Sequence, residues 1–182
     1  MREAAEQAAV TRRGIDAETV VAAQRGDAAA LEQVIRSLGH ELLPLASALT
    51  GGSSDADVLV GETLTKVYER IGQLNEPRAI LAWSRRVLVR TFLDERRWWR
   101  RRPSCRLEAA ATIGSVDPDP AFIDVREAVR GLDRRDRVLL VLHYWQRLTL
   151  AECAAELGIP EGTAKSRLNR ALKRLRARLG DT

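Results

Sequence analysis

The sequence predicts an all-α fold built from two helical units. Apolar residues recur every three to four positions through most of the chain, and good helix formers such as Ala, Leu and Arg are abundant. Aromatic residues make up only 4% of the 182 residues, and no segment has the character of a strand. We therefore expect helices joined by short turns, with no β-sheet.

The first predicted unit extends over residues 16–102. Asp16, Asp27 and Asp55 stand where three of its helices should begin, because a short acidic side chain can cap a helix N-terminus. A fourth helix follows the loop of residues 73–77. We expect that helix to continue through the arginines of residues 96–102 until Pro103 stops it.

The second predicted unit extends over residues 122–182. Residues 103–121 lack apolar periodicity and contain three prolines, which predicts a flexible linker between the units. Asp133 is expected to cap a helix whose apolar residues include Trp145, and two shorter helices follow. Residues 1–15 are interpreted as an N-terminal tail of unassigned role.

Positive charge is concentrated in two stretches of the chain. Residues 78–102 carry 9 basic and 2 acidic side chains, and residues 163–182 carry 7 and 1, whereas the whole chain has a net charge of +5. The two stretches lie at the ends of the two predicted units. This pattern is typical of a chain that grips a polyanion at two places, because phosphate neutralisation supplies most non-specific affinity for nucleic acid.

Residues 149–179 predict a helix-turn-helix. Thr149 and Glu152 have the spacing of a capping box, Gly158 supplies the turn, and Pro160 can start the next helix. The second helix carries basic and amide side chains outside its apolar stripe, which suits the major groove of DNA. The residues expected in the stripe are Ala164, Leu168, Leu172, Leu175 and Leu179.

Three segments of the second unit carry a family resemblance, namely residues 132–140, 148–152 and 157–168. Together they resemble the C-terminal domain of group IV (extracytoplasmic-function, ECF) sigma factors of the sigma-70 family, which reads the −35 promoter element. The sequence from Gly162 to Arg167, Gly-Thr-Ala-Lys-Ser-Arg, is the most specific part of the match. The resemblance implies a region 4-like domain over residues 122–182.

The first unit is similar to the sigma region 2 domain, which binds core RNA polymerase and melts the −10 element. Residues 26–31, 49–62 and 83–102 carry this likeness. The sequence departs from the family pattern at Val58 and Gly61, which weakens any residue-level assignment of polymerase contacts, and at Arg90, which suggests an altered −10 preference.

The resemblance implies roles for individual residues. The expected −35 contacts in the major groove are Thr163, Lys165, Ser166, Arg167, Arg170 and Lys173. The expected −10 contacts are Asn75, Arg78, Arg85, Arg86, Arg90, Arg96 and Arg97, with Asn75 in a loop that receives a flipped base. The expected contacts with core polymerase are Asp55, Asp57, Leu59, Val60 and Glu62, with Leu59 and Val60 as apolar anchors.

The resemblance also implies the partners. They are the clamp helices of the largest polymerase subunit, the flap of the second-largest subunit, promoter DNA and, as a candidate, an anti-sigma factor. We expect the free chain to be a monomer. We expect it in the cytoplasm, because no apolar run reaches the ~20 residues of a membrane span and the polar N-terminus is unlike a secretory signal.

Other classes of function fit the sequence less well. No nucleophile–base pair, phosphate loop or cofactor motif is present, so we expect neither an enzyme nor a cofactor. Cys105 and Cys153 lie far apart and are interpreted as a linker thiol and a small core residue rather than as metal ligands. Two alternatives stay open: a helix-turn-helix regulator that acts without polymerase, and a helical adaptor whose basic segments only solubilise it.

Overall fold

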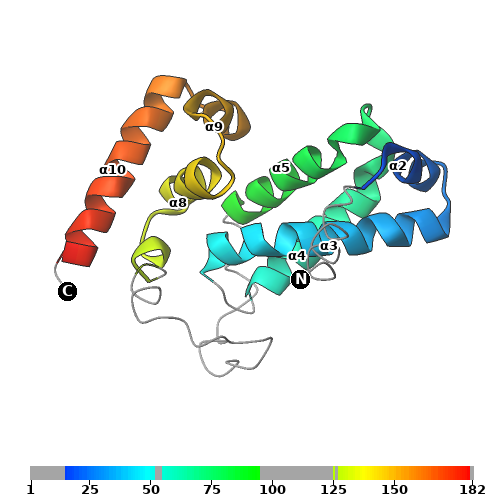
Figure 1. The fold of residues 1–182 in the computed structure, drawn as a ribbon, viewed down its shortest axis with the longest axis horizontal. Coiled ribbons are helices and arrows are strands. Elements are labelled where there is room, and N and C mark those ends of the chain that lie inside the picture. The colour runs from blue at the N-terminus through cyan, green and yellow to red at the C-terminus, as the bar shows by residue number, and fades with distance from the viewer. Residues whose placement is uncertain (1–14, 52–54, 95–124, 126, 181–182) are drawn as a thin grey trace, which may run out of the picture.

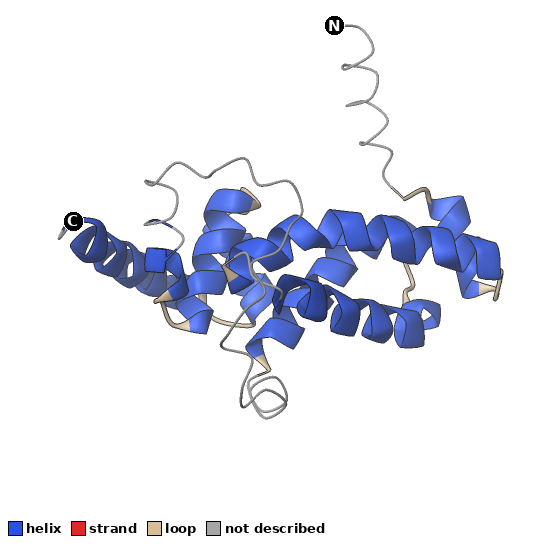
Figure 2. Cartoon of the chain, turned by 90° about the horizontal axis from the view of Figure 1, so that it is seen from below, coloured by secondary structure: helices blue, strands red, loops and turns tan. Residues whose placement is uncertain are grey.

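The computed structural model describes residues 15–51, 55–94, 125 and 127–180. All regular secondary structure in these ranges is helical, as Figure 1 and Figure 2 show. The predicted all-α fold is therefore confirmed. None of the helices in these ranges combines the length and apolar character that a membrane-spanning segment requires.

Four α-helices and two short 3-10 turns form the first unit. They are α2 (Ala17–Gln24), α3 (Ala28–Thr50), α4 (Asp55–Arg70), η1 (Ile71–Gln73), η2 (Pro77–Ala79) and α5 (Ile80–Leu93). Asp16 caps α2 by accepting from the amide of Thr19, and Asp27 caps α3 by accepting from the amide of Ala30. The amide hydrogens at these helix starts are thus satisfied by the predicted residues.

Leucine and valine side chains from all four helices fill the core of the first unit. Leu38, Leu42 and Leu45 of α3 are almost completely buried. They face Leu59 and Val67 of α4, and the same core includes residues of α2 and α5. The apolar residues that recur every three to four positions along α3 therefore form the face along which this helix packs.

The second unit consists of shorter helices and one long one. They are a described helical stretch at residues 127–130, α8 (Arg134–Leu140), the π-helical segment η3 (Val141–Trp145), α9 (Leu150–Leu157) and α10 (Glu161–Gly180). The carboxylate of Asp133 accepts from the amide of Arg135 at 3.0 Å and caps α8 as predicted.

The two units pack against each other, with α5 and the end of α3 facing α8 and η3 (Figure 1). Arg137 of α8 donates to the carbonyl oxygen of Leu49 at 2.8 Å and to that of Leu132 at 3.2 Å. Arg134 donates to the carbonyl oxygen of Phe92 at 3.2 Å. The guanidinium groups of both arginines also lie over the ring of Phe92, 5.3 and 5.8 Å from its centroid. Arginine side chains therefore join the two units alongside an apolar core that continues from one unit into the other.

Gly51 is required at this junction for two reasons. Its φ of +83° ends α3 in the left-handed region, which a residue with a Cβ adopts at a cost. A Cβ at this position would also collide with the side chain of Arg130 from the second unit.

Four details of the predicted helices were wrong. Helix α5 ends at Leu93, since Asp94 has a non-helical ψ of 83°, and the arginines of residues 96–102 lie outside the described residues. Asp55 is the first residue of α4 rather than its cap. Trp145 is 60% exposed and Leu179 is 40% exposed, because the π-helical segment turns Trp145 outward and α10 extends past the core.

We predict that Arg137→Met lowers the free energy of unfolding by about 2 kcal/mol, because it leaves carbonyl oxygens at the junction without a charged donor. Burial lowers the pKa of Arg137, yet the guanidinium stays ionised. The substitution therefore removes a charged hydrogen-bond donor. Urea denaturation followed by circular dichroism measures the difference. Arg135→Met, at an exposed position on the same helix, is the control and should change stability by about 0.5 kcal/mol or less. Equal effects of the two variants would contradict the role given to Arg137.

Candidate nucleic-acid and polymerase interface

The capping box at the start of α9 fixes the entrance to the helix-turn-helix. Thr149 donates from its amide to Glu152 Oε2 at 2.8 Å, and Thr149 Oγ1 accepts from the amide of Glu152 at 3.2 Å. The hydroxyl of Thr149 also donates to Glu152 Oε2 at 2.7 Å. These hydrogen bonds lower the pKa of Glu152 below its usual value. The reciprocal bonds predicted from the spacing are confirmed.

A tight turn connects α9 to α10. Gly158 has a φ of +63°, and the amide of Ile159 donates to the carbonyl oxygen of Ala154 at 3.0 Å. The carbonyl oxygen of Pro160 accepts from the amides of Thr163 and Ala164, so the first turn of α10 forms immediately after it. Cys153 is fully buried beneath this turn, and burial raises the pKa of its thiol to about 11. Its predicted place in the core is confirmed.

The exposed surface of α10 is basic on both flanks of its buried stripe. Ala164, Leu168 and Ala171 are buried against α8 and α9. At about 100° per residue, Arg167 and Arg170 lie on one flank and Lys165 lies on the other. Lys165, Ser166, Arg170 and Lys173 are exposed, whereas Thr163 and Arg167 are half-buried. The hydroxyl of Ser166 donates to the carbonyl oxygen of Thr163 at 3.0 Å, within its own helix.

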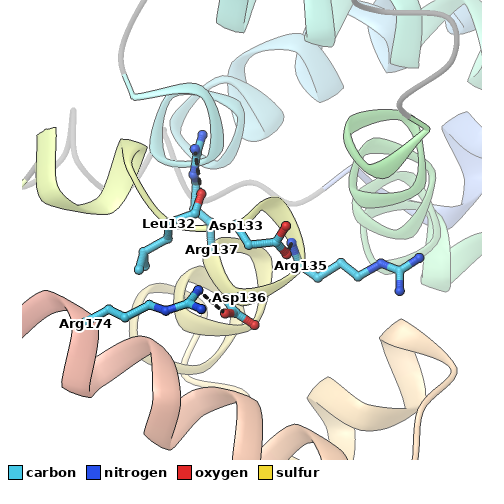
Figure 3. Close-up of polar contacts among 6 residues, drawn as sticks. All are labelled: Leu132, Asp133, Arg135, Asp136, Arg137 and Arg174. Atoms are coloured by element: carbon cyan, nitrogen blue, oxygen red, sulfur yellow. Dashed lines mark hydrogen bonds and ion pairs between the residues drawn. The ribbon is translucent and has the colours of Figure 1, made fainter.

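A cleft of about 560 Å³ separates this flank of α10 from the start of α8. Its lining residues are Leu93, Asp133, Arg134, Arg135, Asp136, Arg167, Arg170 and Arg174. The nearly buried carboxylate of Asp136 pairs with Arg174 at 3.5 Å, as Figure 3 shows. The guanidinium groups of Arg135, Arg167 and Arg170 form neither a hydrogen bond nor an ion pair with the part of the chain that the structure describes. The cleft therefore carries unpaired positive charge.

The residues predicted to contact the −10 element lie on η2, α5 and the loop before them. Asn75, Arg78 and Arg90 are exposed. Arg85 and Arg86 instead face the second unit, where the side chain of Arg86 pairs with Glu156 of α9 at 2.7 Å. The Nε of Arg85 is buried and has no hydrogen-bond partner among the described residues. Arg96 and Arg97 lie outside the described residues.

The residues predicted to contact core polymerase lie on α4. Asp57 is exposed, and Asp55 and Glu62 are half-buried. Leu59 is completely buried and Val60 is 7% exposed, because both side chains pack into the core of the first unit. Their assignment as apolar anchors for the polymerase is therefore wrong for this arrangement of the chain. Sequence reasoning missed Tyr68, which is 61% exposed on α4 and is a large side chain on its polar face.

The described residues contain no group of three or more His, Cys, Asp and Glu side chains placed to hold a metal ion. The arrangement is instead that of a binding surface, with a basic capped helix-turn-helix in one unit and an exposed loop followed by a basic helix in the other. Comparison with known proteins identifies this combination.

The family described as Sigma-70, region 4 matches residues 122–175. The ECF RNA polymerase sigma factor SigM of Mycobacterium tuberculosis is 30% identical, over 91% of this chain and 85% of its own length. The RNA polymerase sigma-E factor of Streptomyces antibioticus is 31% identical, over 85% of this chain and 87% of its own length.

The chain belongs to the ECF RNA polymerase sigma factors. The matches cover both helical units, whereas a regulator that shared only the helix-turn-helix would leave the first unit unmatched. The interpretation as a sigma factor is therefore supported over the stand-alone regulator and the helical adaptor.

Solved structures agree with the fold of this sigma factor. CnrH in complex with the cytosolic domain of CnrY has a TM-score of 0.62 at 22% identity, covering 92% of this chain and 99% of that one. The sigma factor RpoE in complex with the anti-sigma factor NepR from Bartonella quintana has a TM-score of 0.59 at 23% identity, covering 82% and 94%.

We predict that Glu152→Gln destabilises the helix-turn-helix at neutral pH and that this effect disappears in acid. The folded pKa of Glu152 is lowered, so its stabilising effect is fully present above the ordinary value of 4.5 and is lost as the pH falls through the folded pKa. Urea denaturation of both proteins from pH 7 downward measures the difference. A difference that stays constant over this range would contradict the role given to the ionised carboxylate.

Proposed function

We propose that this sigma factor binds core RNA polymerase and directs initiation at promoters that it reads at two elements. In this proposal residues 16–102 form the unit that binds polymerase and the −10 element. Residues 122–182 form the unit that reads the −35 element, and residues 103–121 join them. We expect it to act in the cytoplasm, where its polymerase partner acts.

The observation that carries this proposal is the flank of α10 that holds Arg167 and Arg170. A rigid capped turn presents the helix, its opposite face is buried, and both guanidinium groups lack a partner among the described residues. Arginine is the side chain that most often reads guanine in the major groove, through two parallel hydrogen bonds. Lys165 lies on the other flank, so we assign it a backbone phosphate rather than a base.

On the first unit, we propose that Asn75 contacts a base of the −10 element and that Arg78 and Arg90 contact phosphates. All three side chains are exposed. Arg85 and Arg86 become available to DNA only when the second unit moves away. Glu156 pairs with Arg86, and the junction covers Arg85.

The two units must therefore separate on a promoter. Elements whose centres lie about 25 base pairs apart are separated by about 85 Å of B-form DNA, at about 3.4 Å per base pair. In the present arrangement a helix that packs directly against α10 contacts α5 through the Arg86–Glu156 pair. Two units in direct contact cannot reach two elements that lie about 85 Å apart. We therefore propose that polymerase binding separates the units.

The surfaces left for protein partners are exposed side chains. On α4 these include Asp57 and Tyr68, which we assign to the clamp helices of the largest polymerase subunit. On η3, Tyr144 is 56% and Trp145 is 60% exposed. We propose that these aromatic residues contact the flap of the second-largest subunit or, in the inactive state, an anti-sigma factor, the class of partner in the RpoE–NepR complex.

We expect Arg170→Ala to reduce run-off transcription about tenfold or more on a template that requires the −35 element, because one readout contact contributes about 1–3 kcal/mol. Transcription is measured with bacterial core polymerase, with and without this protein, on promoter fragments. Arg176→Ala removes an arginine from the same helix outside the flank of Arg167 and should change the yield less than twofold. If the wild-type protein supports no initiation but binds duplex DNA tightly alone, the proposal fails in favour of a stand-alone regulator.

Tyr68→Ala should weaken binding to core polymerase about tenfold, because exposed tyrosines are frequent hot spots of interfaces. Anisotropy of the fluorescently labelled protein, titrated with core enzyme, measures the affinity. Gln33→Ala, at an exposed position on α3, is the control and should leave the affinity unchanged. Unchanged affinity of the Tyr68 variant would remove this face of α4 from the interface.

A further inference from the structure

The loop between α4 and α5 presents Asn75 to solvent on a short, well-defined backbone. It consists of η1, Leu74, Asn75, Glu76 and the start of η2. Asn75 is exposed, and its side chain forms no hydrogen bond with any other residue that the structure describes. An amide with free donors and acceptors can bind the edge of a base, provided that the backbone carrying it is held still.

Gln24, the last residue of α2, holds the beginning of this loop. Its side-chain nitrogen donates to the carbonyl oxygen of Ile71 at 2.9 Å and to that of Leu74 at 2.7 Å. The two carbonyl groups are 47 and 50 residues away in the sequence. A single amide group therefore donates to two carbonyl groups that lie three residues apart in the loop, and the second of these belongs to the residue directly before Asn75.

The other bonds of the loop are local. The amide of Leu74 donates to the carbonyl oxygen of Ile71 at 3.2 Å, and the side chain of Glu76 accepts from the amide of Arg78 at 3.3 Å. Local bonds of this kind fix the shape of each 3-10 turn but do not fix the loop relative to the rest of the unit. The side chain of Gln24 belongs to another element, and its hydrogen bonds supply this attachment together with the packing of Ile71 and Leu74 on the core. Gln24 is half-buried, so water competes for these carbonyl groups less than at the surface.

We infer that Gln24 is a positioning residue for base recognition by the loop: it sets the place of Asn75 and thereby the base preference at the −10 element. This inference rests on the proposed function of the loop. A residue that merely stabilised the fold would change the affinity for every base equally. A residue that positions Asn75 instead changes the ratio of affinities between the preferred base and the others.

The test uses Gln24→Glu in the full chain bound to core polymerase. The variant keeps the size of the side chain but replaces the donating amide with a carboxylate that only accepts, facing two carbonyl oxygens. Gln33→Glu makes the same chemical change at an exposed position of α3 and is the matched control. Gln24→Met removes the donors without adding charge and serves if the glutamate variant does not fold.

The probes are fluorescent single-stranded DNA 12-mers, in sets of four that differ in one base. We expect the wild-type complex and Gln33→Glu to prefer one base about tenfold at one position. We expect Gln24→Glu and Asn75→Ala each to reduce this preference to about twofold or less. The double variant should lose no more than either single one, because both changes remove the same recognition.

Two results would overturn the inference while leaving the proposed function intact. One is a Gln24→Glu complex that keeps the wild-type ratio, and the other is a pair of losses that add in the double variant. A wild-type complex without base preference at any position would instead remove the reading role of the loop itself, and the inference would fall with it.

Discussion

The guanidinium of Arg137 joins the end of α3 to the second helical unit by donating to the carbonyl oxygens of Leu49 and Leu132. These bonds satisfy carbonyl groups at a helix end, which otherwise lack a partner. The cost is a partly buried charge surrounded by Arg130 and Arg134, and burial with these neighbours lowers its pKa. The arrangement of the whole chain depends on this junction, because it sets how the helix-turn-helix lies relative to α5.

An apolar core continues from one unit into the other, and charged groups add to the junction at its edge. In the closed chain, in which the two units pack against each other, Glu156 forms an ion pair with Arg86. We propose that a DNA phosphate replaces Glu156 once the units separate. A partly exposed ion pair of this type contributes little to stability, so the free energy needed to part the units is set mainly by the apolar core that they share. The guanidinium groups of Arg135, Arg167 and Arg170 have no partner among the described residues, so the surface that we propose for the −35 element needs no ion pair within them to be broken.

The sequence allowed the caps and turns to be predicted, because their chemistry is local: Asp27, Thr149 and Gly158 act within four residues of their own positions. It did not allow the division of apolar residues between core and surface to be predicted. Leu59 looked like a partner contact and is buried, whereas Trp145 looked like a core residue and is exposed, because the tertiary packing of α4 and η3 decides which way each helix face turns. The contacts of Gln24 were also beyond prediction, since they link positions about 50 residues apart without any charge or motif to mark them.

The measurement that tests the account most directly is the distance between the two units in the free chain and in a polymerase–promoter complex. Spin labels at Gln33→Cys on α3 and Arg176→Cys on α10 report it by pulsed electron resonance, in a Cys105→Ser background. Cys153 is buried with a pKa of about 11 and should stay unlabelled. We predict a single distance in the free chain, set by the packing of the two units, and a longer one in the complex. The same distance in both states would contradict the claim that the chain opens to read two promoter elements.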